Sequence, residues 1–73
     1  MMSYAILAFF ESGRLPEPLR NVSVPVGMLA RSMAAELPVN EETVEGLRKL
    51  LEAKDCFVRS KLLQMAQESE PDA

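Results

Sequence analysis

The stretch "EGLRKLLEAKDCFVRSKLL", residues 45–63, decides the fold because it is helical by every local rule. Its apolar residues recur at steps of three and four, the spacing of one face of an α-helix. Just upstream, Asn40 is a good N-cap residue, and Glu41 and Glu42 put negative charge where the helix dipole favours it. The pattern predicts a helix over residues 41–66, about 40 Å long.

A second apolar stripe precedes the break at "LPVN", residues 37–40. Its members stand at helical steps of three and four: Leu19, Val22, Val26, Leu29 and Met33. Pro25 lies inside this pattern and removes one backbone hydrogen bond. Either one helix over residues 17–37 kinks there, which we expect, or a short helix ends near Ser23 and another begins with Ser23 as its cap.

Two long amphipathic helices joined by a short break fold back on each other as a hairpin. Before them, residues 3–11 ("SYAILAFFE") are strongly apolar, and so short a run is compatible with a strand or a short helix. We therefore expect an all-α protein, an antiparallel helical hairpin with a short N-terminal element, in one domain over residues 1–67. Residues 68–73, "ESEPDA", are predicted to form a flexible acidic tail.

The size of the chain predicts self-association. A domain of 73 residues usually needs a disulfide, a metal or a partner copy for stability. Cys56 is the only cysteine and there is no histidine, so neither a disulfide nor a typical metal set is expected. Because the apolar stripe of the last helix is wider than one partner helix covers, we expect a homo-oligomer.

Charge and composition exclude several classes of function. A net charge of −3 argues against a DNA-binding protein, which normally carries a basic excess. The apolar run "YAILAFF" is too short to span a bilayer, and the lone cysteine is typical of a reducing compartment, so we expect a cytoplasmic protein without a membrane partner. With no histidine, nucleophile elbow or phosphate-binding glycine motif, we expect no enzyme, no catalytic residue, no metal and no cofactor.

The cations of the opening stretch have two interpretations. Three oppositely charged pairs are four residues apart: Glu45 with Lys49, Arg48 with Glu52, and Asp55 with Arg59. This spacing favours a solvated face with weak ion pairs, and the alternative is a surface that holds an anion. Lys54 is the exception, because it falls on the apolar stripe. A lysine there either extends its ammonium out of the seam or meets an anion at it.

Part of the chain resembles a known family. "LPVNEETVEGLRKLLEAKDCFVRSKL", residues 37–62, resembles the hairpin domain of the small phage proteins that act as cyclic-oligonucleotide sponges, the anti-CBASS and anti-Thoeris proteins. The shared pattern is a polar turn, a glutamate in the first helical turn, and a Lys-Leu-x-Glu-Ala core, here residues 49–53. Residues 15–34, "LPEPLRNVSVPVGMLARSMA", are similar to the first hairpin helix of phage-borne relatives.

The resemblance implies a helical hairpin that forms homo-oligomers, hexamers among them, and binds cyclic di- or trinucleotides between protomers without cleaving them. Sequestration of the signal would block a nucleotide-activated antiphage defence. Such a pocket needs cations for the phosphates and flat groups against the bases. The candidate ligand-binding residues are Phe9, Phe10, Arg14, Arg48, Lys54 and Arg59.

The chain also departs from the family pattern. The resemblance implies an aromatic residue near Ser12 and a basic residue near Val24, and neither is present. Either the pocket is built from the candidates above, or the choice of ligand has changed, or binding has been lost. The alternative function is a small helical phage or bacterial module that binds another protein through its apolar face and has no nucleotide ligand.

Overall fold

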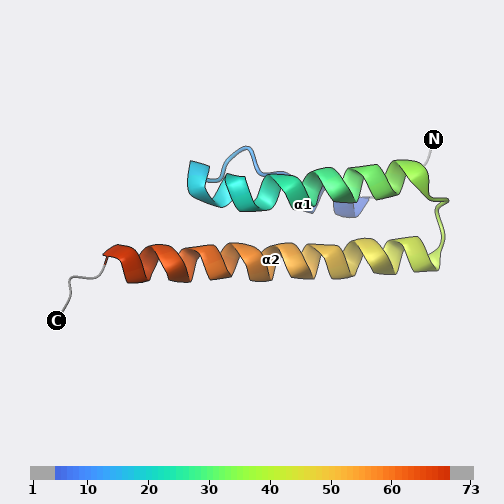
Figure 1. The fold of residues 1–73 in the computed structure, drawn as a ribbon. Helices are drawn as coiled ribbons and strands as arrows, with labels where there is room; N and C mark the ends of the chain where they lie inside the picture. The colour runs from blue at the N-terminus through green and yellow to red at the C-terminus, as the bar shows by residue number, and fades with distance from the viewer. Residues whose placement is uncertain (1–4, 70–73) are drawn as a thin grey trace.

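The computed structural model describes residues 5–69 and consists of three helices. They are the 3₁₀-helix η1 (Ala5–Phe10) and the α-helices α1 (Glu17–Glu36) and α2 (Glu41–Ser69). The two long helices lie side by side and antiparallel, and η1 packs against both (Figure 1). The prediction of an all-helical hairpin is confirmed, and the N-terminal element is a helix rather than a strand.

The first long helix begins and ends at prolines. Pro18 lies in the first turn, where the N–H it lacks would have no partner inside the helix. The helix continues through Pro25, so one helix rather than two is present. It stops at Glu36 because Leu37 precedes Pro38 and is extended, with φ −107° and ψ 150°.

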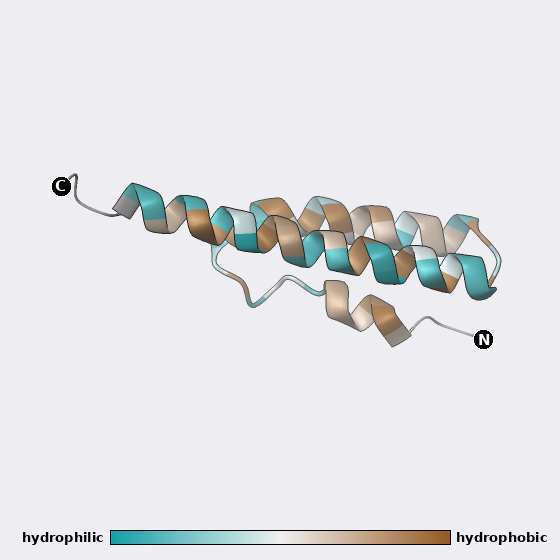
Figure 2. Ribbon diagram, turned by 90° about the horizontal axis from the view of Figure 1, so that it is seen from below, coloured by the Kyte–Doolittle hydropathy of each residue, from teal (hydrophilic) through white to brown (hydrophobic). Residues whose placement is uncertain are grey.

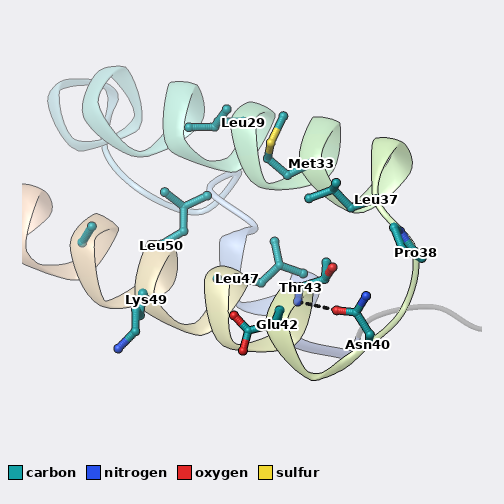
Figure 3. A pocket seen from close by; sticks show the side chains of 12 residues that line it. Leu29, Met33, Leu37, Pro38, Asn40, Glu42, Thr43, Leu47, Lys49 and Leu50 are labelled. Atoms are coloured by element: carbon teal, nitrogen blue, oxygen red, sulfur yellow. Dashed lines mark hydrogen bonds between the residues drawn. The ribbon is translucent and has the colours of Figure 1, made fainter.

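The second long helix begins where the sequence predicts. The Asn40 side-chain oxygen accepts a hydrogen bond from the Thr43 N–H at 2.9 Å, which caps the helix start (Figure 3). The helix runs to Ser69, past the predicted end, so residues 68 and 69 are helical rather than part of a tail. The remainder of the predicted tail, residues 70–73, lies outside the described residues.

The core is small and centres on the contact of η1 with the hairpin. Its buried members are Phe10, Ala30 and Leu47, one from each helix. Partly buried apolar residues surround them: Ile6, Leu7, Val26, Ala34, Leu50 and Leu51. Figure 2 shows the mostly apolar η1 alongside the helix pair, along which hydrophilic and hydrophobic residues are interspersed. None of the helices in residues 5–69 has an apolar stretch long enough to cross a membrane.

The two helical glycines have opposite surroundings, which predicts opposite responses to alanine. A Cβ at Gly27 would lie 3.1 Å from the Phe10 carbonyl oxygen, whereas a Cβ at Gly46 would have nothing within 4 Å. In a single copy of the chain, Gly46→Ala should raise the free energy of unfolding by about 0.5–1 kcal/mol, the usual gain in a helix interior. Gly27→Ala should instead lower the free energy of unfolding, because η1 must shift to accept the methyl group.

Urea denaturation of the two variants and the parent, at a protein concentration low enough to keep the chain monomeric, measures this difference. The expected order of stability is Gly46→Ala, then the parent, then Gly27→Ala. Equal stabilisation by both substitutions would show that η1 does not lie as closely on Gly27 as the structure has it.

Candidate functional site

Two hollows lie on different sides of the hairpin. The first, which we call the basic groove, lies beside η1 and has a volume of about 420 Å³. It is lined by Phe10, Glu11, Ser12, Gly13, Arg20, Val24, Met28 and Arg31. The second, the apolar groove, lies between α1 and α2 near the hairpin turn and has a volume of about 660 Å³. It is lined chiefly by Leu29, Met33, Leu37, Gly46, Leu50 and Ala53.

The basic groove already holds a negatively charged oxygen. One carboxylate oxygen of Glu11, Oε1, accepts hydrogen bonds from the backbone N–H groups of Ser12 (3.1 Å) and Gly13 (3.2 Å). The other oxygen lies 4.0 Å from the Arg31 guanidinium. Successive backbone N–H groups beside a guanidinium are an arrangement that binds anions. The carboxylate of Glu11 therefore marks a position where a phosphate oxygen would be accepted.

The rest of the groove combines charge with apolar surface. Arg20 and Arg31 are eleven residues apart, three helical turns, and so lie on one side of α1 about 16 Å apart along its axis. Between them, Val24 and Met28 are exposed. Guanidinium groups bind phosphate through paired hydrogen bonds, and apolar side chains accept the face of a base.

Two buried serines connect this groove to the core. Ser12 donates a hydrogen bond to the Phe10 carbonyl at 3.2 Å, and its oxygen lies 2.5 Å from that of Ser23. Both serines are enclosed, so the hydroxyl pair joins the segment after η1 to α1. A large aromatic side chain in place of Ser12 would not fit without moving this segment.

Lys54 has a role that the sequence did not predict. It is only 9% exposed, and its ammonium donates a 2.7 Å hydrogen bond to the carbonyl oxygen of Phe9. The same ammonium lies 5.8 Å from the Phe10 ring centroid and 3.6 Å from the Asp55 carboxylate. It therefore neither extends into solvent nor stands free for an anion. It satisfies a carbonyl at the end of η1, where a helix has no internal donor left.

The two aromatic residues predicted to bind the ligand lie in different surroundings. Phe10 is 1% exposed, so its ring is part of the core and has no free face on which a base can stack. Phe9, by contrast, is 65% exposed. Of the two, Phe9 alone is available to a ligand.

The remaining predicted cations lie on the exposed surface. Arg48 pairs with Glu45 at 2.8 Å, and Lys49 pairs with the same carboxylate group at 3.3 Å, as its spacing predicts. Arg59 donates to the Cys56 sulfur at 3.2 Å. Arg14 is exposed in the segment between η1 and α1. None of the three arginines lines the basic groove.

Arg20, Arg31 and Glu11 were missed by sequence reasoning. The two arginines lie at the edge of the α1 stripe, where a cation normally faces water. They form a groove only because η1 and the segment after it pass beside α1, and no local pattern predicts that path.

Within residues 5–69, no cluster of acidic residues and cysteine is arranged to hold a metal ion. Comparison of the chain with protein-family models, with curated proteins and with solved structures finds no match. The function is therefore inferred from the residues and the geometry of the chain itself.

Proposed function

We propose that the protein binds and sequesters a cyclic oligonucleotide signal without cleaving it, and that the basic groove contacts the ligand phosphates. The observation that carries the proposal is the Glu11 carboxylate, which occupies an anion position made by two backbone N–H groups and the Arg31 guanidinium. A ligand phosphate would displace this carboxylate and take over its hydrogen bonds. The resemblance of residues 37–62 to the sponge proteins supports the same class of ligand.

The groove also accounts for the two departures from the family pattern. Ser12 and Val24 both line it, the positions near which the resemblance implies an aromatic and a basic residue. Arg20 and Arg31 supply positive charge one turn before Val24 and two turns after it. Exposed Met28 and Val24 supply apolar surface for a base.

This proposal revises the predicted ligand residues. Lys54 and Phe10 position η1 beside the groove and do not contact the ligand. Phe9, Arg14, Arg48 and Arg59 remain predictions, because such a ligand would bind between protomers and a second copy would bring its own exposed residues. Binding between copies also requires self-association, which is part of the proposal.

A second candidate function is a protein-interaction module without a nucleotide ligand. The apolar groove favours it, since an open hollow lined by leucine and methionine fits an apolar helix. The two functions share a fold and differ in whether the basic groove binds an anion.

Substitutions of the arginines and of the glutamate in the basic groove should change the affinity for a cyclic oligonucleotide in opposite directions. Arg31→Ala and Arg20→Ala should each weaken binding of a cyclic oligonucleotide by roughly tenfold or more, because each removes a charge-assisted hydrogen bond. Glu11→Gln should strengthen binding by roughly two- to fivefold, because the competing exposed ion pair is lost. Calorimetric titration of the parent with a panel of cyclic di- and trinucleotides, followed by the variants, measures these effects.

Lys61→Ala is the matched control, since it removes a cation of α2 that belongs neither to the basic groove nor to the predicted ligand residues. It should leave affinity unchanged. If Arg48→Ala weakens binding and the two groove substitutions do not, the site lies on the outer face of α2 and the basic groove is the wrong assignment. If the parent binds no member of the panel, the protein-interaction function replaces sequestration.

A further inference from the structure

We propose that the apolar groove is covered by a second copy of the chain, with α2 packed antiparallel on α2 about a two-fold axis between Leu50 and Ala53. This interface rests on the self-association in the proposed function but does not depend on the identity of the ligand. The proposed interface specifies the face of the hairpin through which two copies contact each other.

The hairpin has one covered side and one open side. η1 lies across the side that carries Gly27, whereas the apolar groove has no element of residues 5–69 over it. Figure 3 shows Leu29 and Met33 on α1 and Leu50 on α2 among the side chains that line this groove, with Leu50 directed toward α1. Leu29 and Met33 are exposed, so a single copy leaves this apolar face in water.

The face carries a hollow and a projection on the same helix. Gly46, Leu50, Ala53 and Phe57 follow at steps of four, three and four and form one stripe along α2. At one end, nothing lies within 4 Å of a Cβ built on Gly46. At the other end, Phe57 is 53% exposed. The two ends are eleven residues apart, about 16 Å along the helix.

This arrangement is self-complementary. In a two-fold interface each copy presents the same surface, so a projection must find its hollow on that same surface. An axis perpendicular to α2 between Leu50 and Ala53 places Phe57 of each copy over Gly46 of the other. A different protein could fill the hollow but would leave Phe57 without a matching one, and this asymmetry favours a second copy.

A second copy would bury apolar surface that the core of one copy lacks. A stable interface buries about 800 Å² on each partner, which is about one seventh of the 5603 Å² that the chain exposes. Leu29, Met33 and Phe57 leave apolar side chains exposed on both long helices. The buried core of a single copy, by contrast, is small for an independent domain.

Sedimentation equilibrium over a range of concentrations tests the proposal. The parent should form a dimer or a larger even-numbered assembly, and Phe57→Glu should raise the dissociation constant of the pair at least about thirtyfold. Leu62→Glu is the matched control, because Leu62 is also exposed on α2 but lies off the stripe, and it should change nothing. Circular dichroism of each variant checks that the helices are retained.

The register is tested by cross-linking in a Cys56→Ser background. Ala53→Cys lies next to the axis and should form a disulfide-linked dimer on mild oxidation, whereas Leu62→Cys should not. A parent that is monomeric at every concentration, an odd-numbered assembly, an unaffected Phe57→Glu variant, or cross-linking through residue 62 alone would each overturn the interface. A monomer that still binds cyclic nucleotides would overturn only the interface, and an oligomer that binds none would overturn only the proposed ligand.

Discussion

Phe10→Ala should lower the free energy of unfolding by about 3–5 kcal/mol, the usual effect of removing a fully buried phenylalanine. The Phe10 ring is 1% exposed and is the largest side chain in the core, where it joins η1 to both long helices. Small domains have total stabilities of about 5–15 kcal/mol, and this one has a small core. The variant should therefore be largely unfolded at 37 °C, which a thermal melt followed by circular dichroism will show.

Phe9→Ala is the control for this prediction, because it deletes the same group one residue away. Phe9 is 65% exposed, so its loss should change the free energy of unfolding by less than about 1 kcal/mol. All melts should be made at one protein concentration, since self-association adds to the apparent stability. Equal effects of the two substitutions would mean that η1 does not insert Phe10 into the hairpin.

The hairpin could be predicted from the sequence because its causes are local. Helical spacing, the Asn40 cap and the Leu37–Pro38 break each act within a few residues and agree with one another. The predicted end of α2 was too early. The acidic, proline-containing sequence "ESEPDA" is typical of a tail, but α2 continues to Ser69.

The candidate site could not be predicted in the same way because its contacts join distant segments. Lys54 stood out as a cation on an apolar stripe, but its partner, the Phe9 carbonyl, lies 45 residues earlier in the chain. Burial decides between Phe9 and Phe10, and only the packing of η1 determines which ring is enclosed. The same path of η1 brings Glu11 beside Arg31.

One set of contacts thus determines both the core and the site. Phe10 inserts into the hairpin, and Gly27 lets η1 approach α1 closely. Lys54 donates a hydrogen bond to the Phe9 carbonyl oxygen at the end of η1. Phe10 and the next residue, Glu11, both line the basic groove. Changes that loosen η1 should therefore alter the groove without touching its arginines.

Lys54→Met tests that connection and should lower the free energy of unfolding by about 1–3 kcal/mol. Methionine keeps an unbranched apolar side chain in the same space, so the main loss is the 2.7 Å hydrogen bond, which leaves the Phe9 carbonyl without this donor. Urea denaturation measures the effect. Lys61→Met is the control, because Lys61 donates to the exposed Gln64 side chain at the surface of α2, and it should change stability by less than about 0.5 kcal/mol.

The same variant distinguishes a structural Lys54 from a ligand-binding one. A lysine that positions η1 should, when replaced, reduce stability and weaken nucleotide binding together, because the groove beside η1 loses its fixed shape. A lysine that contacts phosphate should reduce affinity roughly tenfold or more with little change in stability. Loss of binding at unchanged stability would thus return Lys54 to the ligand site and contradict the role assigned to it here. Its burial against Phe10 and its bond to the Phe9 carbonyl favour the first outcome.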